Sequence, residues 1–265
     1  MTPEQITKAS QDLFQAEKKR EQIKLLTSDY PDMKMDEAYA VQKALVGLKI
    51  ADGCKVTGWK IGLTSKAMQN ALNIDIPDSG VLLSDMLFQN GDIIPSGRFI
   101  QPRIEAEIAF VIKSDLSGKV SRSDILSATE YVCPSIEILD TRIVRKDEKT
   151  GASRTVFDTI ADNAANAGIV LGNEKHDPLK FDLSWVGAIV SRNGEVEETG
   201  LGGGVLGDPI LGISWLSERL GKYGDKISKG DVVLSGSFIR PIECPSGSNI
   251  RADFSNFGIV ELSFD

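Results

Sequence analysis

The chain has 265 residues, of which 41% are hydrophobic and 26% charged, with a formal net charge of −8. This length is near the upper limit for one hydrophobic core, which predicts one large domain or one domain with an appendage. The negative charge argues against a surface for nucleic acid or for an anionic membrane. An anionic substrate would therefore need arginines or a metal ion at its binding site.

The cysteines and the start of the chain indicate a cytoplasmic protein. Cys54, Cys133 and Cys244 lie far apart, form no C-x-x-C pair and are odd in number. This pattern predicts neither a disulfide framework nor a zinc site. The N-terminus has no apolar segment with a cleavage site, and no apolar run reaches about 18 residues. Secretion and membrane spanning are therefore not expected.

The first part of the chain has helical patterns. A Thr-Pro pair suited to a helix start is followed by apolar residues at helical spacing, which predicts a helix over residues 2–26. A second helix is expected over 36–50 for the same reason. We therefore expect a mainly helical N-terminal portion, residues 1–78, and a β-rich catalytic body, residues 79–265.

Short strands dominate the rest of the chain. Asn193-Gly194 suits the positive φ angles of a type I′ turn and predicts a hairpin there. Helices are expected at about 121–130, which opens with a capping-box-like spacing, and at 208–221. The fold class is therefore α+β. Strands are expected within residues 55–63, 80–88, 105–112, 132–139, 187–198, 231–238 and 249–264.

Two motifs suggest functions that their context excludes. Residues 202–207, GGGVLG, satisfy the dinucleotide pattern G-x-G-x-x-G, but they follow the second arm of a hairpin. Asp208 would also put a negative charge where a pyrophosphate should bind, so we expect it to be a helix N-cap. No G-x-S-x-G motif is present, and His176, the one histidine, lies in a polar stretch. Serine-triad chemistry is therefore not expected.

Glutamates in apolar strands are the chief chemical signal. Glu105 and Glu107 are two residues apart in RIEAEIAFV, so in a strand they share one face and repel each other. Glu137 stands between two isoleucines in a second such strand. Either the pair faces solvent on an edge strand, or the three glutamates hold a divalent cation. An all-carboxylate ligand set favours magnesium or manganese over zinc.

Lys60 has space beside it. In TGWKIGL it shares a strand face with Gly58 and Gly62, which carry no side chains. A ligand could therefore approach its amine, and burial would lower its pKa toward neutrality, as an acid–base catalyst needs. The alternative is an ordinary strand lysine whose amine reaches solvent.

Five ordered blocks across nearly the whole chain resemble one family. They are similar to the hydratase and decarboxylase branch of the fumarylacetoacetate hydrolase superfamily. The resemblance implies a mixed β-sandwich roll preceded by helices, a magnesium or manganese ion, and a homo-oligomer. The blocks are GWKIGLTSKAMQ, IPDSGVLLSDM, PRIEAEIAFV, PSIEILDTR and FDTIADNAANAGIVLG.

The resemblance also implies roles for particular residues. Glu105, Glu107 and Glu137 match the family's metal ligands. Lys60 matches the lysine of its G-x-K-x-G-L-T segment, and Asp78 matches an acidic residue of its P-D/E-x-G segment. We expect Lys60 and Asp78 to be the catalytic proton-transfer groups. One departure is Asp208, since relatives often have histidine there.

Three reactions of this branch are candidates. They are hydration of 2-oxohept-4-ene-1,7-dioate in aromatic catabolism, hydration of 2-oxopent-4-enoate, and decarboxylation of 4-oxalocrotonate. The long segment 143–156 and the GSFIRP motif, residues 236–241, favour the first, because a dicarboxylate needs a cation at its far end. We expect Arg240 and Ser235 to bind the substrate, with Arg240 at the distal carboxylate. A non-catalytic partner subunit is the remaining alternative.

Overall fold

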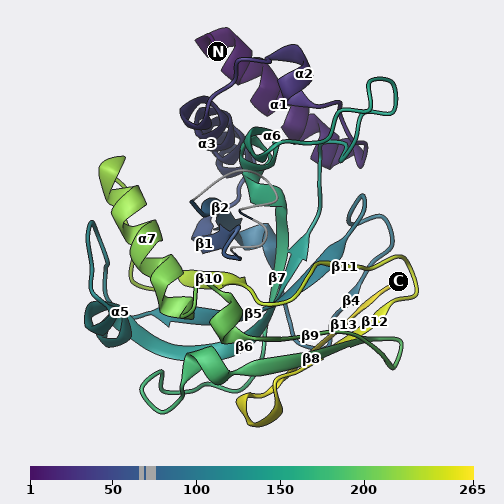
Figure 1. The fold of residues 1–265 in the computed structure, drawn as a ribbon. Coiled ribbons are helices and arrows are strands. Elements are labelled where there is room, and N and C mark those ends of the chain that lie inside the picture. Colours follow the sequence, from purple (N-terminus) through teal and green to yellow (C-terminus); the bar gives the residue numbers. More distant parts are fainter. Residues whose placement is uncertain (66–68, 70–75) are drawn as a thin grey trace.

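Two β-sheets and a group of N-terminal helices make up the fold in a computed structural model, which describes residues 1–65, 69 and 76–265 (Figure 1). Helices α1, α2, α3 and α6 lie together at one end of the molecule, and the sheets lie below them in the view of Figure 1. This is the expected α+β arrangement. Three residues of the GWKIGLTSKAMQ block, 66–68, lie outside the described residues.

The N-terminal helices begin close to the expected positions, but the first ends early. Thr2 and Gln5 form a reciprocal capping box at the start of α1. Arg20 then adopts a left-handed conformation, with φ 59°, and ends the helix, so the expectation of a helix to residue 26 was wrong by seven residues. The helices in the described residues are α1 (Pro3–Lys19), α2 (Leu26–Asp29), α3 (Met35–Ala51), α5 (Arg122–Ala128), α6 (Val156–Ala161) and α7 (Pro209–Lys222).

The larger sheet carries the candidate site. Among the described residues its strands run in the order β2-β1-β10-β5-β6-β7-β3, and β11 pairs antiparallel with the first residues of β5. Strand β1 falls within the expected helical portion, and it pairs with β2 and β10 of the body; the division at residue 78 stays a prediction. The strands are β1 (Val56–Gly62), β2 (Asp78–Leu83), β3 (Leu87–Phe88), β5 (Arg103–Ile112), β6 (Thr129–Leu139), β7 (Asn166–Leu171), β10 (Val232–Ser237) and β11 (Ile242–Glu243).

The smaller sheet runs in the order β4-β13-β12-β8-β9. The expected hairpin is confirmed: Asn193 and Gly194 have φ of 53° and 84° between β8 and β9. A core of aliphatic and aromatic side chains joins this sheet to the larger one. The strands are β4 (Ile93–Ile94), β8 (Gly187–Arg192), β9 (Glu195–Leu201), β12 (Asn249–Asp253) and β13 (Ile259–Phe264).

The expected starts of α5 and α7 are also confirmed. Ser121 and Asp124 form the capping box of α5. Residues 202–207 follow strand β9, and Asp208 caps α7 by accepting the Ile210 backbone N–H at 3.0 Å. His176 stacks on Phe257, away from any serine nucleophile arrangement in the residues that the structure describes. No described helix is long and apolar enough to cross a membrane.

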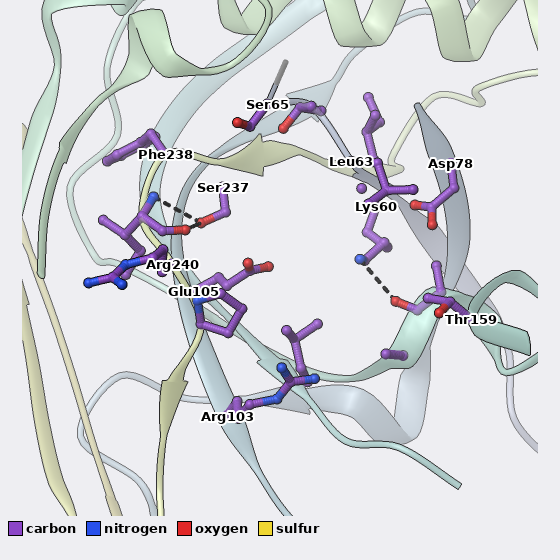
Figure 2. A pocket seen from close by; sticks show the side chains of 18 of the residues that line it. Lys60, Leu63, Ser65, Asp78, Arg103, Glu105, Thr159, Ser237, Phe238 and Arg240 are labelled. Atoms are coloured by element: carbon purple, nitrogen blue, oxygen red, sulfur yellow. Dashed lines mark hydrogen bonds between the residues drawn. The ribbon is translucent and has the colours of Figure 1, made fainter. Parts of the chain in front are cut away.

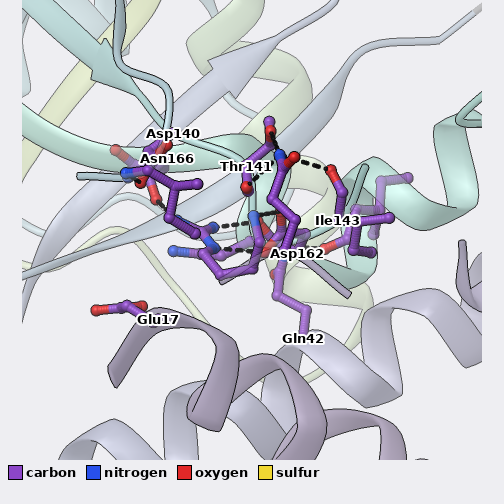
Figure 3. A network of polar contacts seen from close by, with 12 residues as sticks. Glu17, Gln42, Asp140, Thr141, Ile143, Asp162 and Asn166 are labelled. Carbon is purple, nitrogen blue, oxygen red and sulfur yellow. Dashed lines mark hydrogen bonds and ion pairs between the residues drawn. The ribbon is translucent and has the colours of Figure 1, made fainter. Parts of the chain in front are cut away.

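A buried ion pair joins the end of α6 to the residues that follow β6. Arg142 lies just after β6, and its Nε is 2.5 Å from the Asp162 carboxylate in a fully buried position. Its other nitrogens donate to the carbonyls of Asp162 and Asn166 (Figure 3). Nearby, Gln22 donates to the Thr141 carbonyl at 2.9 Å. Arg142 and Asp162 therefore fix the segment between α6 and β7.

We expect Asp162→Asn to lower the free energy of unfolding by about 3–5 kcal/mol, because it leaves a buried guanidinium without its counter-charge. Urea denaturation followed by circular dichroism measures this. Arg251→Met is the matched control, since Arg251 pairs with Glu261 at the surface and such pairs contribute under about 1 kcal/mol. Equal losses in the two variants would contradict this role of the buried pair.

Candidate active site

Three carboxylates converge on one face of the larger sheet. Strands β5 and β6 pair so that Glu105 lies directly opposite Glu137, and Glu107 lies one step along the same face. One oxygen from each of the three side chains lies within 4.8 Å of the others. The alternative that Glu105 and Glu107 face solvent on an edge strand does not hold, because β5 is flanked by β6 and β10.

Burial makes these carboxylates costly to ionise. Burial raises the pKa of Glu105 to about 7, and the charge of Glu137 adds to the rise. The pKa of Glu107 is raised well above its ordinary value by burial and by the same neighbour. Burial also raises the pKa of Glu137, although Lys60 opposes the shift. Without a further cation, this cluster holds protons near neutral pH.

The donor set fits a divalent cation. Neither oxygen of the fully buried Glu137 forms a hydrogen bond among the described residues, although one of them is 3.2 Å from the Lys60 amine. Glu107 accepts the Gly236 backbone N–H at 2.8 Å, which orients its carboxylate. Buried orphan oxygens are rare unless an ion or water satisfies them. Three carboxylates with free oxygens are the ligands that magnesium and manganese prefer.

Lys60 in β1 and Asp78 in β2 lie on two strands of the same sheet that pair with each other. The Lys60 amine is 3.2 Å from a Glu137 oxygen and donates to the Ala164 carbonyl at 3.1 Å (Figure 2). A Cβ at Gly62 would lie 2.2 Å from an Asp78 oxygen and 3.2 Å from the Lys60 amine. Glycine at position 62 is therefore needed for these two side chains to occupy their positions.

The carboxylates around Lys60 oppose the expected effect of burial on its pKa. Burial is the largest influence and lowers it, but the combined charges of Glu137, Asp78 and the other glutamates outweigh burial and raise the pKa above its ordinary value. The pKa of Asp78 is raised by burial, with Lys60 opposing. The glycines of TGWKIGL correctly predicted open space beside the lysine. The local pattern did not reveal that carboxylates from other strands face its amine.

A strained turn that the sequence did not reveal completes this side of the site. Asn163, Ala164 and Ala165 have φ of 51°, 53° and 60°, a left-handed conformation that costs energy in residues other than glycine. The Asn163 side chain compensates by bonding both the N–H and the carbonyl of Val81. The turn points the Ala164 carbonyl at Lys60.

A cavity of about 450 Å³ opens above the carboxylates. Glu105 and Lys60 face each other across it in Figure 2. Arg240 lies at its rim, with a side chain 82% exposed and paired with Glu198. Ser235 lies on β10, fully buried, with no partner for its hydroxyl among the described residues. Sequence reasoning missed Arg103 and Arg154, which also line the cavity.

Comparison with known proteins identifies the family. No model of a known protein family matches the chain. It is 46% identical over 259 residues to the 2-oxo-hept-4-ene-1,7-dioate hydratase of Escherichia coli, covering 97% of both chains. It is 36% identical to the 2-keto-4-pentenoate hydratase of Paraburkholderia xenovorans, covering 100% of this chain and 97% of that one.

Solved structures agree. The chain is similar to the 4-oxalocrotonate decarboxylase of Pseudomonas putida G7, complexed with magnesium and adipate, with a TM-score of 0.94 and 30% identity over 100% of this chain and 99% of that one. The chain belongs to the hydratase and decarboxylase branch of the fumarylacetoacetate hydrolase superfamily. It is therefore an enzyme of the lyase class, since members of this branch hydrate or decarboxylate 2-oxo acids. The predicted family and fold are confirmed.

We expect the effect of magnesium on stability to grow with pH. A carboxyl group with a raised pKa in the fold stays protonated while the unfolded chain ionises, so the metal-free protein loses stability as pH rises from about 4.5 toward 7 through Glu105. Magnesium displaces these protons. The increase in Tm on replacing EDTA with Mg²⁺ should therefore be larger at pH 8 than at pH 5.

Glu105→Gln should reduce this pH dependence, because one of the three carboxyl groups with a raised pKa no longer titrates. The exposed Glu195→Gln is the matched control and should behave like the unmodified protein. A magnesium effect that is independent of pH, or that survives unchanged in Glu105→Gln, would contradict the expectation.

Proposed function

We propose that this protein is a magnesium-dependent hydratase that adds water to 2-oxohept-4-ene-1,7-dioate and forms 4-hydroxy-2-oxoheptanedioate, a step in aromatic catabolism of the homoprotocatechuate and 4-hydroxyphenylacetate type. The observation that carries the proposal is the 46% identity, over nearly the whole chain, to the hydratase of Escherichia coli named for this acid. The converging glutamates supply the chemistry that such a reaction needs.

Glu105, Glu107 and Glu137 would hold the metal ion. Magnesium is proposed, with manganese as the alternative, because a relative of the same fold is complexed with magnesium and the donors are all oxygens. When bound, the ion supplies a Lewis acid for the carboxylate and 2-oxo oxygens of the substrate. The protein's part is to hold the three ligands on one rigid sheet face.

Lys60 and Asp78 are the proposed proton-transfer groups. Water must lose a proton as it adds at C4, and C3 must receive one. Both side chains line the cavity beside Glu105, and both are buried, which keeps competing water away. The hydrogen bond from Lys60 to Ala164 fixes the position of the amine. Ser235 and Arg240 stay predicted substrate-binding residues.

Decarboxylation of 4-oxalocrotonate is the second candidate, supported by the TM-score of 0.94 to a decarboxylase. Hydration is favoured because the relatives with higher identity are hydratases. A 2-oxopent-4-enoate substrate is the third candidate. We also propose that the protein works in the cytoplasm, as the cysteine pattern predicts, and that it is a homo-oligomer, as the family resemblance implies.

A direct assay tests the proposed function. Purified protein with Mg²⁺ should consume 2-oxohept-4-ene-1,7-dioate, followed by ultraviolet absorbance, and mass spectrometry should find a product heavier by one water. Chelation with EDTA should stop turnover, and added Mg²⁺ should restore it. Loss of carbon dioxide from 4-oxalocrotonate without any hydration would show that the protein is a decarboxylase instead. Full turnover in EDTA would refute the requirement for a metal ion.

We expect Lys60→Met to reduce kcat by about 10²–10⁴-fold, the usual contribution of a positioned acid or base. Its Mg²⁺ binding should persist, measured by calorimetry, because the three glutamates remain. Lys55→Met, at an exposed position five residues away, is the matched control and should keep full activity. A Lys60→Met protein with normal kcat would exclude Lys60 from proton transfer.

A further inference from the structure

Two arginines that line the cavity, Arg103 and Arg154, have side chains without a direct hydrogen-bonding partner among the described residues. Neither Arg103 nor Arg154 forms an ion pair or a side-chain hydrogen bond within the part of the chain that the structure describes. The Nε of Arg103 and one terminal nitrogen of Arg154 are buried with no hydrogen-bond partner. A partly buried guanidinium without an acceptor is costly, and a carboxylate satisfies it with two parallel hydrogen bonds.

Arg240, the arginine expected from the sequence, has a different environment. It is largely exposed and already pairs with Glu198. Figure 2 shows its guanidinium directed away from Glu105 and Lys60, whereas the Arg103 side chain extends beneath the cavity that these two residues face. Binding a substrate carboxylate at Arg240 would therefore require this side chain to turn and to leave its partner.

Arg103 lies in line with the proposed metal ligands. Successive odd positions of β5 share one face, so Glu107, Glu105 and Arg103 follow one another at spacings of about 7 Å. A 2-oxo acid held at its C1 and C2 oxygens beside the glutamates has its far end a few carbon atoms along this row. An acceptor for Arg103 at that distance is a second carboxylate on the same molecule.

Arg154 approaches from the segment that the sequence singled out as long. The backbones of Lys146 and Ser153 pair in this segment as an isolated antiparallel β-bridge. The Arg154 backbone N–H donates to the Arg145 carbonyl at 2.9 Å. Arg145 itself pairs with Glu243. Burial lowers the pKa of Arg154, Asp162 opposes the shift, and the positive charges of Arg103 and Arg145 lower the pKa further. Arg103 and Arg154 therefore line the same cavity and lie near enough to each other to interact.

We propose that Arg103 and Arg154 form a subsite for the distal carboxylate of a 2-oxo dicarboxylic acid and so select diacids over monoacids. The identity of the diacid rests on the proposed function, but the subsite does not depend on turnover. Arg103 supplies a cation on the same strand as the metal ligands, and Arg154 supplies one from the 145–154 segment. Together they neutralise the second carboxylate.

Equilibrium binding tests this subsite independently of catalysis. With Mg²⁺ present, calorimetry compares 2-oxoheptanedioate with 2-oxoheptanoate, two saturated acids that differ in the distal carboxylate and that the enzyme cannot hydrate. The unmodified protein should bind the diacid more tightly. Arg154→Met and Arg103→Met should each reduce this preference by about 10- to 100-fold, the range for hydrogen bonds to a charged group.

Two further variants serve as controls. Arg251→Met, far from the cavity on the smaller sheet, is the matched control and should keep the preference. Arg154→Lys should restore part of it, because a charge remains without the paired geometry. Monoacid binding and Mg²⁺-dependent Tm report whether each variant has folded.

The outcomes separate the two proposals. A preference that persists in both Arg154→Met and Arg103→Met, or that is lost in Arg240→Met instead, would overturn the subsite. A third outcome is that the unmodified protein hydrates neither 2-oxohept-4-ene-1,7-dioate nor 2-oxopent-4-enoate while both variants lose the preference for the diacid. That result would support the subsite and exclude the proposed hydratase function.

Discussion

Mutual repulsion among three buried carboxylates is the constraint around which this protein is built. Glu105 and Glu137 face each other across a strand pair, and Glu107 adjoins them. Lys60 is the cation nearest to them, and a single positive charge cannot balance three negative ones in a medium of low dielectric constant. The site therefore lacks positive charge, and a divalent ion would supply it. The groups around the three glutamates must stay rigid for that ion to be held.

That rigidity comes from outside the sheet. The left-handed turn at residues 163–165 fixes the Lys60 amine through a backbone carbonyl, and the Arg142–Asp162 pair holds the start of that turn. Helix α3 contributes as well, because Gln42 donates to the carbonyls of Ser79, beside Asp78, and of Ile160 in α6. The helical portion therefore supports the site although it supplies none of the proposed metal ligands.

Sequence reasoning succeeded where local patterns determine the structure. Alternation in β5, the Asn193-Gly194 turn and the capping residues act within a few positions, so their elements were found. The end of α1 at Arg20 was missed, since a left-handed arginine leaves no sequence signal. The convergence of the glutamates was inferred through family resemblance, because register between strands far apart in sequence is a tertiary property. The surroundings of Arg103 and Arg154 were missed for the same reason.

The segment 145–154 has a separate consequence. It contributes Arg154 to the cavity lining and is held by the Arg145–Glu243 pair at the surface, while the proposed proton-transfer groups and metal ligands belong to β1, β2, β5 and β6. In the proposed subsite, Arg154 therefore comes from a stretch that supplies no reacting group, whereas Arg103 shares β5 with two of the proposed metal ligands. Shortening or replacing this segment would leave the reacting centre intact, so enzymes for acids of different length could diverge by loop exchange on a shared catalytic sheet.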